Sequence, residues 1–281
     1  MFMFAAGYAL ANRWGKDLSI SSRWFRGSQG GSAFADFRRD FHLKQFPQIA
    51  RHFDLDDRFP SLSNRLLHKR LHVANRYQSR IYVEQRPGFD SMLVDHPKRY
   101  LLGYFQSPRY FDEDQSRLQA LFTLNSADEQ ALRQRHRSLT TPGSRSVMIH
   151  VRRDDSLVPG NDWAGILSTK YFHTVMREWD TEATDFLVFS DSPDWCQDQP
   201  AFRHAQVVHE PDPVVTMRLM SFCDDFIIAG STLSWWGAWL GQAADKKVIA
   251  PVPFFRRSSK DAWAGLLPLS WELRAADWSS A

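Results

Sequence analysis

The sequence is poor in cysteine and has no long apolar run. Its two cysteines, Cys196 and Cys223, allow one disulfide at most and supply too few thiolates for a cysteine-based zinc site. We therefore expect a reducing compartment and two small buried apolar residues. The apolar run at 1–11 is shorter than the roughly 18–20 residues that cross a bilayer. Because it also lacks a cationic start and a cleavage site, we predict a buried helix there.

Nucleotide-binding fingerprints and internal repeats are missing too. The chain contains neither GxGxxG nor GxxxxGK[ST], which argues against a dinucleotide-dependent oxidoreductase and a P-loop NTPase. No repeat is found at a period of roughly 20–50 residues, so a solenoid is not indicated. Apolar residues make up 43% of the 281 and charged residues 24%, which is ordinary globular composition. The length favours about two domains.

Charge is unevenly divided along the chain. Residues 1–146 hold 23 Lys and Arg against 14 Asp and Glu, whereas residues 147–281 hold 12 against 18. A solvated, arginine-rich face accounts for the basic half, and an anionic acceptor, a lipid headgroup surface or RNA are the alternatives. The turn-forming segment TTPGSR at 140–145 coincides with this shift. We place a domain boundary there, between residues 1–145 and 146–281.

The second half alternates short apolar runs with helical patterns. This alternation predicts an α/β domain with a parallel sheet and helices on both faces. The predicted strands are 147–151, 186–189, 206–209, 226–229 and 247–250, and the helices are 171–179, 214–222 and 234–244. The first half is less regular, with helices expected at 2–13, 61–79 and 115–138 and strands at 81–84 and 100–105.

Polar clusters directly follow three of the predicted strands. They are HVRRDD at 150–155, SDSPDW at 190–195 and GSTLSWW at 230–236. Ligands of open parallel sheets bind beyond the carboxyl ends of the strands, so we expect all three clusters to meet in one crevice.

The residue types in these clusters favour a phosphate or diphosphate ligand. Arg152 and Arg153 offer planar forks that match phosphate oxygens. Hydroxyls and backbone N–H groups at a strand-to-helix junction form an anion site, and Gly230 allows close approach to the backbone. Trp235, Trp236 and Trp239 cannot all face one way on a helix, so we expect them mainly to pack it on the sheet.

Several segments together resemble the α-1,2-fucosyltransferase family. HVRRDD at 150–155 resembles the family's H-x-R-R-x-D motif, and STLSWWGAWL at 231–240 resembles its S-[ST]-F-S-W-W-G-A-W-L block. Further similar segments are FSD at 189–191 with Trp195 and Cys196, GYFQS at 103–107 with Tyr110 and Phe111, and the start at 1–11. The segments occur in the family's order.

The resemblance implies a fold and a reaction. It implies two Rossmann-like domains that face each other across a cleft, a GT-B arrangement. The C-terminal domain would bind GDP-fucose and the N-terminal domain would help to hold the acceptor. The implied reaction transfers L-fucose to O2 of a terminal galactose, inverts the anomeric centre and needs no metal or other cofactor. Fixed cations and N–H groups aimed at the departing β-phosphate suit that chemistry.

The resemblance also implies roles for individual residues. The catalytic candidates are Arg153 and Asp155. The candidates for binding the sugar donor are His150, Arg152, Arg153, Ser190, Asp191, Ser231, Thr232 and Ser234. Asp155 is either the general base or, as we favour, a carboxylate that holds a guanidinium in place. Two D-x-D spellings, at 54–56 and 112–114, read as surface or helix-start carboxylates rather than a metal site.

The chain departs from the family pattern at its start. The family begins with a strand and a G-G-L-G-N-Q loop, whereas this sequence begins at the following Met. A first strand of the N-terminal sheet is therefore expected to be missing, either through a misassigned start codon or a real truncation. A strand and a glycine loop would add about 12–15 residues upstream.

Other functions remain open on the sequence alone. A catalytically inactive protein that binds GDP or a sugar is the main alternative, and an RNA-binding domain lacks any recognisable motif. The acceptor is open among an O-antigen, a free glycan and a lipid-linked oligosaccharide. We expect a cytoplasmic protein, with peripheral membrane association where lipid-linked glycans are built.

Overall fold

The chain folds into two compact units in this computed structural model. Unit 1 comprises Met1–Asn125 and Ala264–Leu266, and unit 2 comprises Ser126–Trp263 and Leu267–Ala281. The division falls after Asn125, earlier than the turn at 140–145 where the sequence changes its charge. The structure describes, with the side chain of Asp155 excepted, residues 1–21, 41–53, 80–158, 163–179, 182–257 and 265–279.

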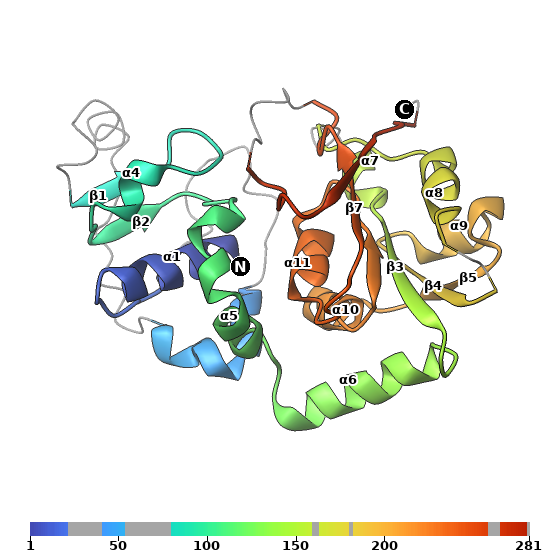
Figure 1. The fold of residues 1–281 in the computed structure, drawn as a ribbon, viewed down its shortest axis with the longest axis horizontal. Helices are drawn as coiled ribbons and strands as arrows, with labels where there is room; N and C mark the ends of the chain where they lie inside the picture. The colour runs from blue at the N-terminus through green and yellow to red at the C-terminus, as the bar shows by residue number, and fades with distance from the viewer. Residues whose placement is uncertain (22–40, 54–79, 159–162, 180–181, 258–264, 280–281) are drawn as a thin grey trace. The chain divides into compact units, whose positions relative to one another are not determined.

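A six-stranded parallel sheet forms the centre of unit 2 (Figure 1). Its strand order is β5-β4-β3-β6-β7-β8, and each neighbouring pair is parallel. This confirms the α/β fold with a parallel sheet. The strands are β3 (Arg145–Val151), β4 (Thr184–Ser190), β5 (Ala205–Val208), β6 (Asp225–Ile227), β7 (Val248–Val252) and β8 (Glu272–Ala275).

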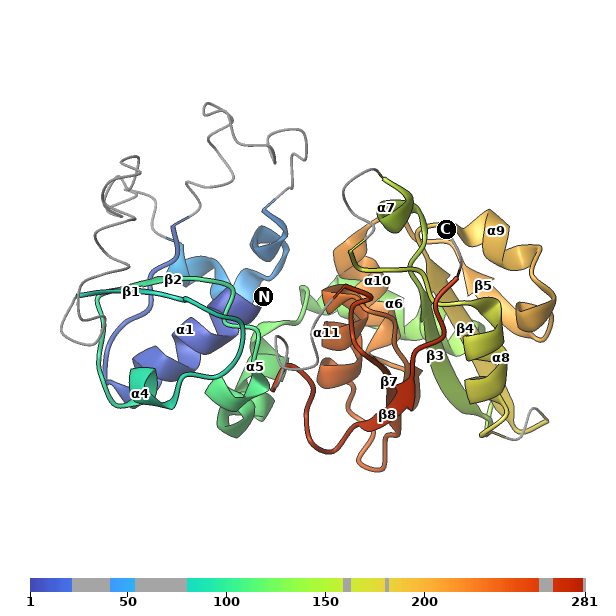
Figure 2. The same ribbon diagram turned by 90° about the horizontal axis from the view of Figure 1, so that it is seen from above.

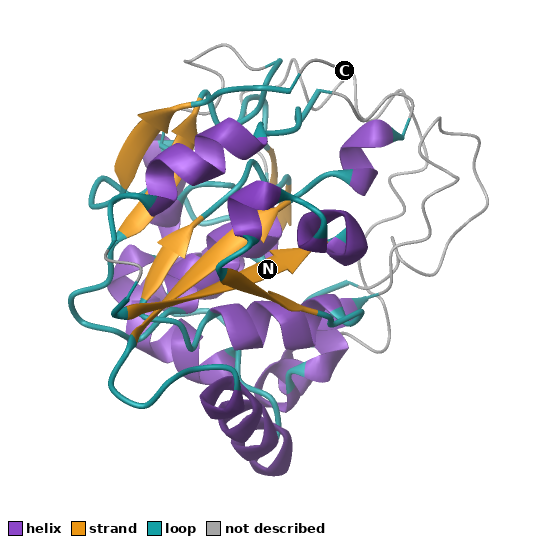
Figure 3. Ribbon diagram, turned by 90° about the vertical axis from the view of Figure 1, so that its right-hand side faces the viewer, coloured by secondary structure: helices purple, strands orange, loops and turns teal. Residues whose placement is uncertain are grey.

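Helices cover both faces of this sheet. In Figures 1 and 2, α8 and α9 lie on one side of the strands and α10 and α11 on the other. Figure 3 shows the same layering of helices about the strands. The helices of unit 2 are α6 (Ser126–Ser138), α7 (Asp154–Leu157), α8 (Thr169–Met176), α9 (Pro193–Gln197), α10 (Pro213–Met220) and α11 (Thr232–Leu240), and Pro200–Phe202 forms a 3-10 turn, η5.

Side-chain caps fix where three of these helices begin. Ser168 accepts from the N–H of Tyr171 at the start of α8, and Asp212 accepts from two N–H groups at the start of α10. Ser231 does the same for the N–H of Leu233 at the start of α11. Each cap satisfies backbone donors that the helix itself leaves unpaired.

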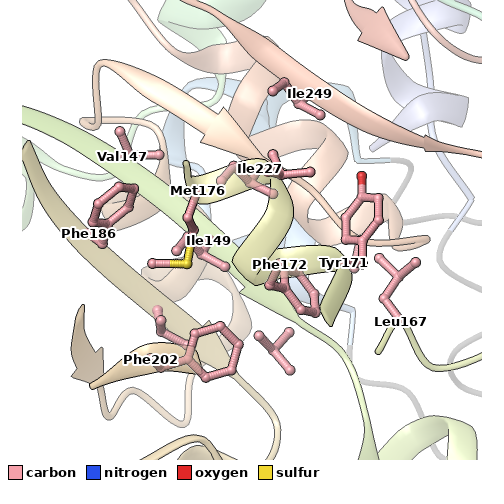
Figure 4. Close-up of a cluster of buried hydrophobic side chains, with 14 of the residues drawn as sticks. Val147, Ile149, Leu167, Tyr171, Phe172, Met176, Phe186, Phe202, Ile227 and Ile249 are labelled. Carbon is pink, nitrogen blue, oxygen red and sulfur yellow. The ribbon is translucent and has the colours of Figure 1, made fainter. Parts of the chain in front are cut away.

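The core of unit 2 lies between the sheet and α8 (Figure 4). Successive residues of a strand point to opposite faces. Val147, Ile149 and Val151 of β3 therefore join the cluster with Tyr171, Phe172, Val175 and Met176 of α8. The alternate residues Met148 and His150 are also buried, so β3 is covered on both faces. Burial on both faces explains why its sequence is almost continuously apolar.

The predicted elements of the second half are present with shifted ends. Each of the five predicted strands and three predicted helices has a counterpart within a few residues. The structure adds β8 and the short helices α7 and α9, which the sequence pattern did not predict. Among the described strands, β8 is the edge strand beside β7, and most of its residues are exposed. Because β8 is mostly exposed, its residues do not alternate between apolar and polar. The sequence pattern therefore could not predict this strand.

Unit 1 contains a two-stranded parallel sheet. β1 (Ile81–Val83) pairs with β2 (Tyr100–Leu102), which confirms the two strands expected in the first half. Helix α1 (Phe2–Arg13) matches the predicted buried helix, and eight of its residues are buried. The remaining elements are η1 (His42–Gln45), η2 (Pro47–His52), α4 (Ser91–Val94), η3 (Pro108–Tyr110), η4 (Asp112–Asp114) and α5 (Gln115–Leu121).

The helix expected over 115–138 is broken in two. α5 ends at Leu121 and α6 begins at Ser126. The ring of Phe122 is fully buried and contacts the rings of Phe4 and Phe46 edge to face. The distances between ring centroids are 5.4 Å to Phe4 and 5.3 Å to Phe46. This anchor holds the end of α5 in unit 1, whereas α6 packs on α10 of unit 2. Tertiary packing therefore divides a continuous helical pattern.

Two sequence features lie outside the described residues. They are the helix predicted at 61–79 and the D-x-D spelling at 54–56. Among the residues that are described, no helix combines the length and apolarity that a membrane span requires.

Candidate functional site

The three polar clusters converge at the carboxyl-terminal edge of the unit 2 sheet, where its parallel strands end. They follow β3, β4 and β6, and β3 lies between the other two. The chain runs from β3 outward through β4 to β5, then returns to the other side of β3 and runs through β6 to β8. The direction of winding therefore reverses between β3 and β6. Such a topological switch point is where open α/β sheets bind ligands.

Arg152 spans this switch point. It follows β3, and its Nη1 donates to the carbonyl oxygen of Gly230, which follows β6, at 3.4 Å. The side chain is half-buried. The contact places a guanidinium between the two loops that border the reversal.

Arg153 is held by two contacts from the loop and helix after β4. Its backbone N–H donates to Oδ1 of Asp191 at 2.8 Å. Its guanidinium carbon lies 4.6 Å from the ring centroid of Trp195, which belongs to α9. A guanidinium over an indole face is a cation–π arrangement. Asp191, a candidate for binding the sugar donor, therefore also binds the backbone of Arg153, a contact that the sequence did not indicate.

The start of α11 lies at the same edge, directly after β6. Ser231 caps the helix, with its Oγ accepting from the N–H of Leu233 at 3.3 Å. Thr232, the first helical residue, is half-buried. The first turn of a helix directs N–H groups outward along the axis and carries a partial positive charge. These N–H groups and the two guanidinium groups are hydrogen-bond donors suited to an anionic ligand.

Ser234, a candidate for binding the sugar donor, lies in the first turn of α11. Its side chain is fully buried, and its Oγ donates to the carbonyl oxygen of Ser231 at 3.2 Å. In this structure the hydroxyl stabilises the first turn of α11. Trp235, Trp236 and Trp239 are likewise buried, with their ring centroids 5.0 to 6.1 Å apart. They pack the helix, as expected.

Gly230 lies against the segment that follows β7. A Cβ at this position would lie 2.2 Å from the carbonyl oxygen of Phe254 and 3.3 Å from the ring of Phe255. Both residues follow β7, the neighbour of β6. A glycine is needed here because the segment after β7 passes too close to leave room for a side chain.

His150, Ser190 and Asp155 complete the candidates. His150 lies near the carboxyl end of β3 and is 5% exposed. Ser190 ends β4, and its Oγ accepts from the N–H of Ser192 at 2.9 Å. Asp155 belongs to α7, but its side chain lies outside the described part of the structure.

A second arginine pair at this edge was missed from the sequence. Arg256 and Arg257 follow β7 and are exposed. Their N–H groups donate to the carbonyl oxygens of Ala164 and Trp163, at 3.1 and 3.0 Å. The signal was present, since these residues also follow a strand, but the apolar stretch at 251–255 separates them from the predicted strand end. The loop after β7 therefore carries two exposed arginines.

Cysteines and acidic clusters behave as structural features. Cys196 and Cys223 are free and buried, and burial raises the pKa of both thiols. Asp114 of the second D-x-D spelling binds Arg117 at 3.0 Å on the surface. Within the described ranges, no group of three or more His, Cys, Asp or Glu side chains has an arrangement that could hold a metal ion.

Comparisons with known proteins place the chain among glycosyltransferases. Residues 41–263 match the family described as glycosyl transferase family 11. The alpha-1,2-colitosyltransferase of Escherichia coli is 27% identical over 289 aligned positions, covering 94% of this chain and 91% of that protein. The O-antigen biosynthesis glycosyltransferase WbnK of Escherichia coli is 28% identical over 181 residues, covering 59% of this chain. That second match spans 60% of the length of WbnK, less than two thirds.

A solved structure gives a weaker likeness. A crystal structure of POFUT1 in complex with GDP aligns with a TM-score of 0.35 and 12% identity, covering 55% of each chain. The family match, by contrast, spans well over half of the sequence and includes the three polar clusters described above. The chain therefore belongs to glycosyl transferase family 11.

Proposed function

We propose that this protein transfers L-fucose, or a closely related deoxyhexose, from its GDP derivative to O2 of a terminal galactose. The observation that carries the proposal is the arginine pair at the switch point, beside the start of α11. The alpha-1,2-colitosyltransferase relative supports a deoxyhexose donor and an α-1,2 linkage. We assign the nucleotide to unit 2 and the acceptor to unit 1.

The proposed reaction is a displacement at the anomeric carbon. O2 of galactose forms a bond to C1 of the sugar while the bond from C1 to the β-phosphate oxygen breaks. GDP leaves with the bonding electrons, the hydroxyl proton passes to a base, and the anomeric configuration inverts. No metal takes part in this proposal.

Arg152, Arg153 and the first turn of α11 stabilise the departing diphosphate. Negative charge grows on the β-phosphate as the bond breaks, and fixed cations and N–H donors lower the energy of that state. Arg153 is suited to this task because Trp195 and Asp191 hold it before the substrate arrives. Preorganised charges need no rearrangement during the reaction.

Asp155 keeps the two roles assigned from the sequence. We favour the structural role, in which the carboxylate orients an arginine, over the role of general base. The pH profile of Asp155→Asn separates them, because replacing a base changes the acid limb of the profile whereas replacing an orienting carboxylate lowers the rate at every pH.

An assay of sugar transfer tests the proposed function. Purified protein is incubated with GDP-fucose or GDP-colitose and a panel of β-galactosides, and products are identified by mass spectrometry and linkage analysis. We expect a 1,2-linked product with at least one donor. Binding of GDP by calorimetry without any product indicates a binding protein instead.

Two arginine variants test the site. Arg153→Ala is expected to lower turnover by about 100- to 1000-fold, as the loss of one charge-stabilising donor does in other enzymes. Arg133→Ala is the matched control, because Arg133 also lies over an aromatic ring, that of Phe222 at 4.5 Å, at the opposite edge of the sheet. Near-normal turnover by Arg153→Ala rejects the assigned role.

A further inference from the structure

The loop after β2 in unit 1 holds a strained aromatic residue. Among the described residues, Phe105 is the single non-glycine residue with positive φ, at 50°. A bulky side chain disfavours this left-handed conformation. Such strain persists only where the surrounding structure enforces it, and it gathers at ligand sites.

Packing beneath the loop enforces the conformation. The ring of Phe105 is 2% exposed and lies 6.1 Å from the ring of Tyr82 and 5.9 Å from that of Tyr110. The N–H of Ser107 donates to the carbonyl oxygen of Phe105 at 2.8 Å. Ser107 is itself fully buried, and its Oγ donates to the carbonyl oxygen of Gly265 at 2.8 Å. Both sides of the strained residue are therefore fixed.

Glu84, which directly follows β1, binds the backbone of the loop after β2. Its Oε2 accepts from the N–H groups of Tyr104 and Phe105, at 2.7 and 3.2 Å. A side chain at Gly103 would meet the Cβ of Glu84 at 2.4 Å, so the glycine permits this approach. Burial raises the pKa of Glu84, and the two backbone donors act against that rise.

The side chain of Tyr104 is exposed although its backbone is held in place. The strained residue after it is buried and its own N–H is bound, yet its side chain is 70% exposed. An exposed tyrosine on a mobile loop needs no explanation. One whose backbone is held by a half-buried carboxylate and a strained neighbour presents a preorganised aromatic face.

We infer that Tyr104 is a stacking platform for the galactose of the acceptor and that Glu84 is the residue that positions it. Galactose has an apolar face formed by its C–H groups, and that face packs on an aromatic ring. Tyrosine suits such a contact because its ring is apolar and its hydroxyl remains in water. The loop also lies at the carboxyl edge of a parallel strand pair, where α/β proteins bind ligands. This inference rests on the proposed function, since it names the acceptor site of the same reaction.

Kinetics of three variants test the platform. Tyr104→Ala is expected to raise the acceptor KM about five- to tenfold, while kcat and the KM for the sugar donor stay within about twofold. Tyr104→Phe keeps the ring and is expected to restore the acceptor KM. Met92→Ala is the control, because Met92 is also a large exposed side chain of unit 1, at 48%. An unchanged acceptor KM in Tyr104→Ala overturns the inference.

Glu84→Gln tests the positioning role. The glutamine keeps the size of the side chain but weakens acceptance from the two N–H groups, so the acceptor KM is expected to rise as in Tyr104→Ala. A purely structural carboxylate would instead lower thermal stability and kcat without shifting the acceptor KM selectively. An acceptor KM equal to that of the wild type removes Glu84 from the inference.

A binding measurement separates this inference from the proposed function. Saturation-transfer NMR with methyl β-D-galactoside reports contact between the sugar and the protein without any turnover. Signal in the wild type that is lost in Tyr104→Ala supports the platform even if no transfer is detected, in which case only the proposed reaction fails. If transfer is detected but the NMR signal is the same in Tyr104→Ala, the platform is rejected and the reaction stands.

Discussion

The guanidinium of Arg153 lies over the indole ring of Trp195, with 4.6 Å between its central carbon and the ring centroid. The two residues come from different segments of unit 2, Arg153 from the end of β3 and Trp195 from α9. The N–H of Arg153 is bound at the same time by Asp191. The loop after β4 thus binds the backbone of Arg153, which follows β3, and α9 contacts its side chain.

Removing the indole is expected to impair the arginine. In Trp195→Leu the guanidinium loses a cation–π contact of about 0.5–2 kcal/mol, so turnover should fall by roughly 2- to 30-fold while the acceptor KM stays unchanged. Trp195→Phe, which keeps an aromatic face, should recover most of the rate. Phe222→Leu removes an equivalent contact with Arg133 at the far edge of the sheet and should leave turnover intact. Equal rates in the leucine and phenylalanine variants of Trp195 would count against this role.

Gly230 is expected to tolerate no side chain. Its added Cβ would lie 2.2 Å from the backbone oxygen of Phe254, which cannot move as a flexible side chain does. We expect Gly230→Ala to lower the free energy of unfolding by about 3 kcal/mol and to weaken GDP binding, because Arg152 donates to the Gly230 carbonyl. Urea denaturation and calorimetry measure the two effects. Gly143→Ala is the control for backbone strain without a clash, since Gly143 has a φ of 90° but nothing within 4 Å of its Cβ, and it is expected to lose less stability than Gly230→Ala. If the two variants are equally stable, the clash is not the reason for the glycine.

The core of unit 2 could be predicted because buried strands are rich in apolar residues, which the sequence shows directly. Residues of β3 are buried on both faces, which produces the apolar run that identified the strand. β8 has one partner strand and mostly exposed residues, so its sequence carries no such mark. The break before α6 was missed for a different reason. Local helical pattern cannot show that Phe122 packs in one unit while α6 packs in the other.

The site could be located from the sequence, but its internal contacts could not. Polar residues that follow adjacent parallel strands must meet, so the order of strands and clusters was enough to predict the edge. The partner of a given hydroxyl or carboxylate depends on side-chain rotamers and on neighbours distant in sequence. For that reason the capping of α11 by Ser231, the inward hydroxyl of Ser234 and the contact of Asp191 with Arg153 needed the structure.

A buried ion pair is expected to hold α6 against α10 within unit 2. The side chain of Arg218 in α10 is 2% exposed, and it contacts both carboxylate oxygens of Glu129 in α6, at 2.8 and 2.9 Å. Glu129→Gln leaves the arginine buried and short of a countercharge, so we expect a loss of about 3–5 kcal/mol in the free energy of unfolding. The double variant Glu129→Leu with Arg218→Met should recover much of that loss, because no buried charge remains. Denaturant titration of the three proteins decides this, and a double variant no more stable than Glu129→Gln contradicts it.

Asp225 is expected to make stability depend on pH in the acid range. It lies at the start of β6, is 1% exposed, and accepts from the side chains of Arg145 and Trp179 and from the N–H of Lys247. Burial pushes the pKa of this carboxyl upward, but Arg145 and the other donors outweigh it and hold the pKa below its ordinary value of 3.8. Below pH 3.8 the unfolded chain therefore binds the proton more readily than the folded protein does.

This carboxyl's contribution should be complete above about pH 5 and should be lost as the pH falls through its lowered folded-state pKa. Asp225→Asn is expected to be about 3 kcal/mol less stable than the wild type at pH 7, and the difference should shrink below pH 4. Urea denaturation from pH 3 to pH 7 measures it. Asp245→Asn is the matched control, because Asp245 binds the same arginine at 3.0 Å but its side chain is 77% exposed. Water already screens that exposed pair, so its loss should barely change the curve. If the two variants give the same pH dependence, the stabilisation comes from the charge of Arg145 in general and not from the buried carboxylate at the start of β6.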